Sequence, residues 1–183
     1  MKKTITKLFS VAIIVLTTIS FSACSKQKFH VNGAITDAKD SILYFENISL
    51  KGPVIVDSVK LSSDGTFSFS DDSPHAPEFY RLRINDQIIN LAIDSTETVT
   101  FKAKYPTMPT DHTVEGSYEC SKIKELALLQ ITLTNKALAL EANTELGANA
   151  VRENLKMALN TYKNYVKQYY IFKEPNKAYA YFA

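Results

Sequence analysis

Hydrophobic and polar residues alternate one by one along the chain from residue 29 to about residue 116. Phe29 and Val31, for example, flank the polar His30. Because successive side chains of a β-strand point to opposite faces of its sheet, this alternation predicts strands with one buried face. The pattern repeats in seven or eight segments, at residues 29–35, 41–46, 54–61, 66–70, 79–84, 88–93, 98–103 and 112–115.

Short polar turns connect these segments. Asp64-Gly65 suits a tight turn because both residue types tolerate positive φ angles, and Asn85-Asp86 separates two later segments. Parallel neighbours need a crossover of about a dozen or more residues, usually a helix, and no helical pattern separates the segments. The first half therefore predicts an antiparallel β-sandwich or a barrel-like sheet of seven to eight strands.

From residue 121 the hydrophobic pattern changes to the period of an α-helix. Ser121 is the expected N-cap of a first helix, and a second helix is expected over residues 148–172, before Pro175. The sequence thus predicts an α+β fold, an antiparallel β-sandwich followed by an antiparallel α-helical hairpin. The first helix is apolar on two sides, which indicates cover on both; its second apolar face contains Leu128, Ile131 and Leu138.

The first 23 residues have the layout of a secretory signal. A basic segment with three lysines precedes an apolar run over residues 8–21. That run is too short to span a bilayer, because a spanning helix takes about 20 residues, and it suits the apolar region of a signal peptide. The lysines are Lys2, Lys3 and Lys7.

Small residues at Ser22 and Ala23, directly before Cys24, resemble the lipobox of bacterial lipoproteins. In that family the cysteine is acylated and becomes the mature N-terminus, although Phe21 departs from the usual leucine. The resemblance implies lipid attachment at Cys24. The alternative is an ordinary signal peptide cleaved nearby, which would leave Cys24 as a free thiol.

Removal of the signal changes the sign of the net charge. The whole chain has 21 basic and 19 acidic residues, a net charge of +2. Three of its lysines belong to the signal, so residues 24–183 have 18 basic and 19 acidic residues and a net charge of −1. No block of like charge remains, and the composition gives no indication of nucleic-acid binding.

Cys120 is the remaining cysteine once Cys24 carries lipid. A single thiol forms no intramolecular disulfide, and the sequence has no C-x-x-C redox pair. Cys120 lies just before the predicted start of the first helix, where the helix dipole favours a thiolate. A reactive thiol is therefore one hypothesis, and a small side chain packed at the corner between strand and helix is the favoured alternative.

Other polar residues form no recognisable catalytic or metal-binding motif. The three histidines lack the i, i+4 spacing of a metal pair, and an aspartate pair lacks calcium-loop spacing. Two arginines share a strand face, where they could bind an anion or form the solvated side of a sheet. We expect no metal, no cofactor and no catalytic residue. The residues concerned are His30, His75, His112, Asp71, Asp72, Arg81 and Arg83.

Tyrosines concentrate near the C-terminal end, where six of the ten lie between residues 162 and 181. Tyrosine combines apolar area with a polar tip and suits interfaces. These residues are therefore candidates for contact with a partner, and the alternative is that they cover the sandwich or the first helix. They are Tyr162, Tyr165, Tyr169, Tyr170, Tyr179 and Tyr181.

Three sequence segments, in order, together resemble a known family. They are VDSVKLSSDGTFSFS, EFYRLRINDQIINLAIDSTETVTF and HTVEGSYECSKIKEL, followed by the predicted helical hairpin. The chain is similar, over about residues 29–182, to the domain of unknown function at the N-terminus of many envelope thiol-disulfide oxidoreductases of Gram-negative bacteria. In that family a helical connector leads into a thioredoxin-like domain with the redox cysteines. This sequence ends at Ala183, before such a domain, so the resemblance assigns no catalytic residue here.

The expected organisation follows from these observations. We expect a non-enzymatic, lipid-anchored protein of the bacterial cell envelope, at the outer membrane facing the periplasm, that positions or docks a thioredoxin-like partner. A stand-alone envelope lipoprotein that binds a small ligand or a partner protein is the alternative, and a redox sensor using Cys120 is a third hypothesis. The expected segments are a signal peptide (1–23), a linker (24–28), a β domain (29–116), a helical connector (117–175) and the start of an unfinished helix (176–183).

Overall fold

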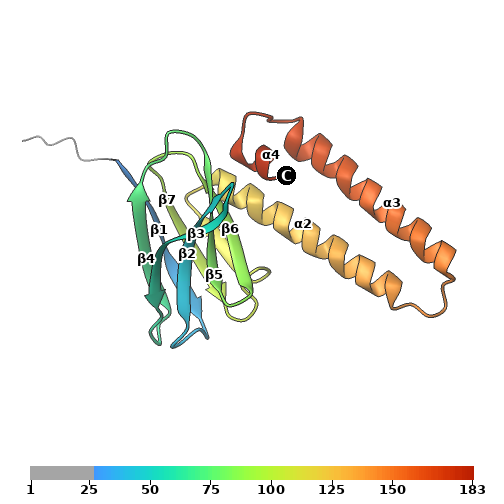
Figure 1. Cartoon of the computed structure of the whole chain (residues 1–183), viewed down its shortest axis with the longest axis horizontal. Coiled ribbons are helices and arrows are strands. Elements are labelled where there is room, and N and C mark those ends of the chain that lie inside the picture. Colours follow the sequence, from blue (N-terminus) through green and yellow to red (C-terminus); the bar gives the residue numbers. More distant parts are fainter. Residues whose placement is uncertain (1–26) are drawn as a thin grey trace, which may run out of the picture.

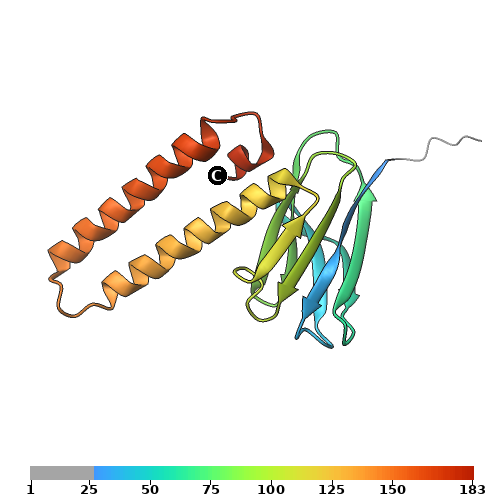
Figure 2. The same ribbon diagram turned by 180° about the vertical axis from the view of Figure 1, so that it is seen from behind.

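The computed structural model describes residues 27–183, and Figures 1 and 2 show it from two opposite sides. Over that part, eight strands are followed by three α-helices and one π-helical turn. The strands form one body, from which α2 and α3 project as a long hairpin (Figure 1). The elements are β1 (Lys28–Thr36), β2 (Ile42–Ser49), β3 (Gly52–Lys60), β4 (Thr66–Asp72), β5 (Glu78–Ile84), β6 (Gln87–Ile93), β7 (Thr98–Lys104), β8 (His112–Glu115), α2 (Tyr118–Glu141), α3 (Ala148–Val166), η2 (Lys167–Ile171) and α4 (Ala178–Phe182).

The strands form two sheets of four, in the orders β4-β1-β7-β8 and β3-β2-β5-β6. The predicted α+β class, a β-sandwich followed by helices, is confirmed. The prediction of antiparallel neighbours throughout is wrong for one pair, because β1 and β7 run parallel, with His30 opposite Thr98. No crossover helix is needed for this pair, because the chain crosses between the two sheets, through five other strands, before it returns beside β1.

The space between the sheets is filled by the apolar side chains that the alternation placed on one face. In β2, for example, Leu43 and Phe45 are fully buried while Ile42 is about half exposed. The Phe45 ring stacks between Phe69 and Tyr80, with ring centroids 5.3 and 5.0 Å apart. Aromatic pairs of this kind contribute about 0.5–1.5 kcal/mol each beyond the area they bury, so Phe45 links both sheets.

Gly33 allows the two parallel strands to approach closely. A Cβ added at Gly33 would lie 1.9 Å from the backbone oxygen of Phe101 in β7. No side chain fits at that distance, and a strand glycine often marks such an approach. The pairing of β1 with β7 therefore requires glycine at position 33.

Helix α2 begins earlier than the sequence predicted. Its N-cap is Ser117, whose Oγ accepts a hydrogen bond from the Cys120 N–H at 3.3 Å, and Gly116 precedes it with φ of +89°. The predicted N-cap Ser121 lies inside the helix, where its hydroxyl donates to the Ser117 carbonyl oxygen. The reason is physical: an N-cap residue itself has a non-helical, extended backbone, and that backbone is found at Ser117, whereas Ser121 is already helical.

Helix α2 is covered on two sides only in its first turns. Ile123 and Leu126 are buried with Ala92 of β6. Further along, Leu138 on the second apolar face is 58% exposed. We refer to residues 127–165, which form the projecting part of α2 and α3, as the arm. Within the described chain no helix is long and apolar enough to span a membrane.

The second predicted helix is interrupted near its end. α3 stops at Val166, and the next five residues form the π-helical turn η2. The chain then turns back, and α4 lies between the ends of α2 and α3 beside the sandwich (Figure 1). Tyr179 of α4 is only 1% exposed, and Phe182 contacts Phe79 with ring centroids 5.9 Å apart.

Candidate functional site

The predicted lipid attachment residue, Cys24, lies outside the described residues, together with the predicted signal peptide. Its acylation therefore stays a prediction. The described chain begins at residue 27, just before β1. Any tether attached at Cys24 would consequently lead directly into a strand at the interior of a sheet, because β1 lies between β4 and β7.

Cys120 is packed at the corner between the sandwich and α2. Its side chain is 1% exposed, and its Sγ donates a hydrogen bond to the carbonyl oxygen of Ala92 at 3.2 Å. Burial, together with the nearby carboxylates of Glu97 and Glu119, raises the pKa of the thiol to about 12. These effects outweigh the helix dipole and disfavour the thiolate that a reactive cysteine requires.

The histidines do not come together. His112 is buried in β8, where its Nδ1 lies 2.8 Å from the Met108 carbonyl oxygen, and burial lowers its pKa. His30 is exposed on β1. Among the described residues, no group of three or more histidine, cysteine, aspartate or glutamate side chains could hold a metal ion.

The arginine pair is neutralised within the protein. Glu46, which is 3% exposed, lies between Arg81 and Arg83 on the outer face of its sheet. The nearest nitrogen–oxygen distances are 2.5 Å to Arg81 and 2.6 Å to Arg83. The hydrogen bond from Arg83 is the main reason why the pKa of Glu46 is lowered. Glu46 therefore occupies the position in which an external anion would bind, a partner that the sequence pattern did not reveal.

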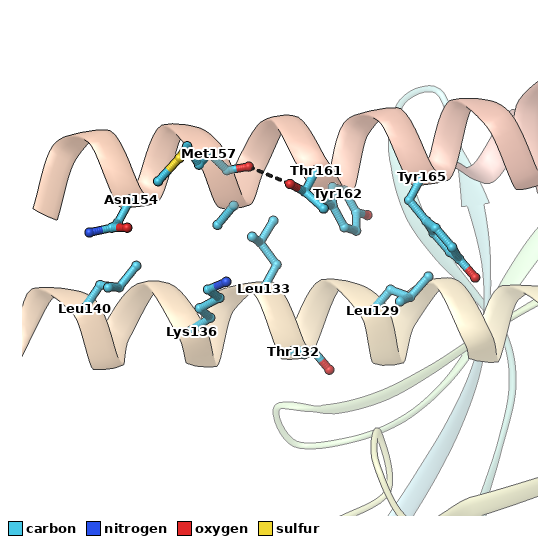
Figure 3. Close-up of a pocket in the computed structure, with 11 residues that line it drawn as sticks. Leu129, Thr132, Leu133, Lys136, Leu140, Asn154, Met157, Thr161, Tyr162 and Tyr165 are labelled. Atoms are coloured by element: carbon cyan, nitrogen blue, oxygen red, sulfur yellow. Dashed lines mark hydrogen bonds between the residues drawn. The ribbon is translucent and has the colours of Figure 1, made fainter. Parts of the chain in front are cut away.

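A groove runs along the arm between α2 and α3, and Figure 3 shows its side chains. Its volume is about 340 Å³. Leucines from α2 face Met157, Ala158 and Tyr162 of α3, while Lys136 supplies the one charge in its lining. The eleven lining residues include no cysteine, histidine or carboxylate; they are Leu129, Thr132, Leu133, Lys136, Leu140, Asn154, Met157, Ala158, Thr161, Tyr162 and Tyr165.

The C-terminal tyrosines divide between three environments. Tyr162 lines the arm groove, and Tyr181 is 73% exposed on α4. The other four gather where α2, α3, η2 and α4 meet, although Tyr165 also lines the groove, and Tyr118 joins them from the start of α2. Tyr118 was not among the predicted residues, because it lies more than 40 positions before the C-terminal group in the sequence.

Three glutamates hold this region together. Tyr170 donates its hydroxyl hydrogen bond to Glu125 at 2.9 Å. Glu174 accepts hydrogen bonds from the hydroxyls of Tyr118, at 3.2 Å, and Tyr179, at 2.5 Å. The buried Glu119 accepts the backbone N–H of Tyr179 at 3.0 Å. Sequence reasoning missed all three glutamates, because each of these hydrogen bonds, except the one between Glu174 and Tyr179 five positions apart, joins residues far apart in the chain.

Comparisons with known proteins give a family and weak similarities to solved structures. Residues 29–122 match the model of a family described as a domain of unknown function. A crystal structure of (S)-allantoin synthase aligns at 10% identity and a TM-score of 0.36, over 51% of this chain and 45% of that one. The CBM25-1 module of a beta/alpha-amylase from Paenibacillus polymyxa aligns at 12% identity and a TM-score of 0.32, over 51% and 96%. No curated protein matches the sequence.

Proposed function

The chain belongs to the family Domain of unknown function (DUF4369), and we propose that it is a non-catalytic, lipid-anchored module of the bacterial cell envelope. In this proposal a lipid on Cys24 holds the chain at the outer membrane, facing the periplasm. The arm then docks or positions a thioredoxin-like thiol-disulfide oxidoreductase domain. The association with thioredoxin-like domains comes from the family resemblance of the sequence.

The observation that carries the docking role is the uncovered apolar surface of the arm. Beyond Leu126 no residue of α2 is buried, and α3 buries only Ala158 and Val166. Met157 and Leu138, each 58% exposed, leave apolar area in water on both helices. Contiguous exposed apolar surface of this kind is typical of interaction sites, and a two-helix layer commonly needs another layer against it.

The chemistry of the groove favours docking over catalysis. Its lining offers apolar contacts, a few neutral polar groups and the Lys136 ammonium, but no thiol, imidazole or carboxylate. Cys120 is buried at the other end of α2, against Ala92, and its pKa is raised to about 12. A docking role requires only shape and apolar area, both of which the arm supplies.

A stand-alone lipoprotein that binds a small ligand is the second candidate function. The groove volume of about 340 Å³ falls at the lower end of the range of about 300–1,000 Å³ for ligand sites. Mostly apolar lining with a few polar groups is also usual for such sites. An apolar small molecule would then occupy the groove in place of a protein surface.

Two full-length variants test the docking role. In detergent, we expect a purified thioredoxin-like domain of an envelope oxidoreductase to bind the full chain. Met157→Glu should weaken this binding at least about tenfold, because it removes a central apolar contact of the interface. Leu50→Glu is the matched control, because Leu50 is fully exposed in the β2–β3 turn of the sandwich. Equal binding by both variants would contradict docking at the arm.

The other parts of the proposal have separate tests. Mass spectrometry of the mature chain should find an acylated Cys24 at its N-terminus, and an unmodified cysteine or cleavage elsewhere would remove the anchor from the proposal. An insulin-reduction assay should find no dithiol activity, since the sequence has no C-x-x-C pair. Robust reduction of insulin would refute the non-enzymatic role.

A further inference from the structure

Five tyrosine rings enclose a small pocket where the ends of the helices meet. We refer to Tyr118, Tyr165, Tyr169, Tyr170 and Tyr179 as the tyrosine cage. Neighbouring ring centroids lie 4.6 Å apart for Tyr165 and Tyr169, and 6.0 to 6.2 Å apart for the other contacting pairs. The pocket has a volume of about 140 Å³, and its lining is completed by Lys122, Glu125, Lys173 and Glu174.

The π-helical turn contributes two neighbouring members of the cage. Tyr169 and Tyr170 both lie in η2, which interrupts the regular helix after Val166. Tyr170 is buried and bonded to Glu125 of α2, whereas Tyr169 is half exposed. π-Helical turns are rare and are frequent at functional sites, so the local structure singles out this part of the chain independently of the ring contacts.

The protein's own ammonium group already contacts the cage. Lys122 Nζ lies 5.6 Å from the centroid of the Tyr118 ring and 5.9 Å from that of Tyr170. Both distances fall within the limit of about 6 Å for a cation–π interaction. Lys122 therefore shows which chemistry the ring faces accept, and its ammonium stands where the head group of a cationic ligand would lie.

Carboxylates supply the counter-charge and fix the rings. Glu125 lies 2.7 Å from Lys122 Nζ and accepts the Tyr170 hydroxyl, while Glu174 accepts those of Tyr118 and Tyr179. These hydrogen bonds hold three of the five rings, those of Tyr118, Tyr170 and Tyr179, in place. Burial, reinforced by these carboxylates, raises the pKa of Tyr170 and Tyr179, which keeps both phenols neutral.

We propose that the tyrosine cage binds the head group of a small organic ammonium ion, which displaces Lys122 from the ring faces. A volume of about 140 Å³ corresponds to about five water molecules at ~30 Å³ each. That is room for a methylated ammonium head group but not for a drug-sized ligand. Cages of aromatic rings are a general means of recognising quaternary ammonium groups. This inference does not rest on the proposed docking role.

Choline is the probe that tests the cage, and 3,3-dimethyl-1-butanol is its uncharged counterpart of the same shape. The full chain contains ten tyrosines and no tryptophan, so its fluorescence in dodecyl maltoside micelles comes from tyrosine, and half of the tyrosines belong to the cage. Ring-current shifts of the choline methyl protons provide a second readout by NMR. We expect saturable choline binding and at least about fivefold weaker binding of the alcohol, since only choline carries the charge.

Three substitutions locate the binding at the cage. Tyr165→Leu should weaken choline binding about two- to fivefold, the usual effect of one exposed cation–π contact, and Lys122→Met should strengthen it by removing the competing ammonium. Tyr181→Leu is the matched control, because Tyr181 is 73% exposed outside the pocket, and should leave binding unchanged. Equal affinity for choline and the alcohol, no choline binding by the unmodified chain, or unchanged binding by Tyr165→Leu would each overturn the proposal. Far-UV circular dichroism confirms that each variant is folded.

Discussion

Replacement of Tyr179 by alanine tests whether the C-terminal segment is part of the folded structure. The Tyr179 side chain is buried against Tyr118 and Tyr170, its hydroxyl donates to Glu174, and its backbone N–H donates to Glu119. A buried tyrosine removes about 150–250 Å² from water. At about 25 cal/mol per Å² this corresponds to about 4–6 kcal/mol, an upper value because the unfolded chain is itself partly compact.

Direct measurements on other proteins place aromatic-to-alanine substitutions in cores at about 3–5 kcal/mol. The two scales agree on a loss of about 4 kcal/mol, a large part of the about 5–15 kcal/mol that stabilises a typical domain. We therefore expect Tyr179→Ala to lower the free energy of unfolding of residues 27–183 by that amount, as measured by urea denaturation with far-UV circular dichroism.

Tyr181→Ala provides the control, because Tyr181 lies two positions further in the same short helix and is 73% exposed. Surface substitutions usually change stability by less than about 0.5 kcal/mol. If the two variants unfold within about 0.5 kcal/mol of each other, then α4 contributes nothing to the stability of the body, and the packing argument for this segment fails.

Three further predictions follow from buried groups. Cys120 should react with iodoacetamide at pH 8 at least about a hundredfold more slowly in the native protein than in urea, because burial raises its pKa to about 12. Peptide mapping distinguishes the modification of Cys120 from that of Cys24. Equal rates in the native and the unfolded protein would contradict the burial of Cys120. The free energy of unfolding should fall as the pH drops below about 6.5, because burial, helped by Lys124, lowers the pKa of His112 in the folded state and protonation then favours unfolding. His112→Gln should reduce this dependence of stability on pH, whereas a change at the exposed His30 should not. An unchanged dependence in His112→Gln would count against the role of His112. Gly33→Ala should cost about 3 kcal/mol, the upper end of the usual range for overpacking, because the new Cβ would lie 1.9 Å from the Phe101 oxygen. Gly147→Ala, where the new Cβ would meet no atom within 4 Å, should cost about 1 kcal/mol or less. Similar losses for both variants would refute the close approach of β1 and β7.

The strands were predictable because their cause is local. In β4, Asp64-Gly65 precedes a strict alternation in which Phe67 and Phe69 are buried, and the strand runs over Thr66–Asp72 as a slight extension of the predicted range. Local alternation carries no information on which strands become neighbours. The parallel pairing of β1 with β7 depends on how the chain crosses between sheets, and that was predicted wrongly.

The helix boundaries and the tyrosine cage were harder to predict from the sequence. Ser117 and Ser121 are equally good caps by residue type, and only the positive φ of Gly116 and the extended Ser117 backbone decide between them. The C-terminal enrichment of tyrosine was visible in the sequence. Its organisation was not, because Tyr118 meets Glu174 across 56 positions of the sequence, and no periodicity relates residues so far apart.

The placement of β1 has a kinetic consequence. β1 is the first of the described strands to be made, yet it completes its sheet only by pairing with β4 on one side and β7 on the other. Because five strands separate β1 from β7 in sequence, the loop closed by this contact is long, and contacts of high sequence separation slow folding. The edge of β1 that faces β7 therefore stays open until most of the sandwich has emerged during synthesis. Folding of β1 thus waits for β7, the seventh of the eight described strands, to be made.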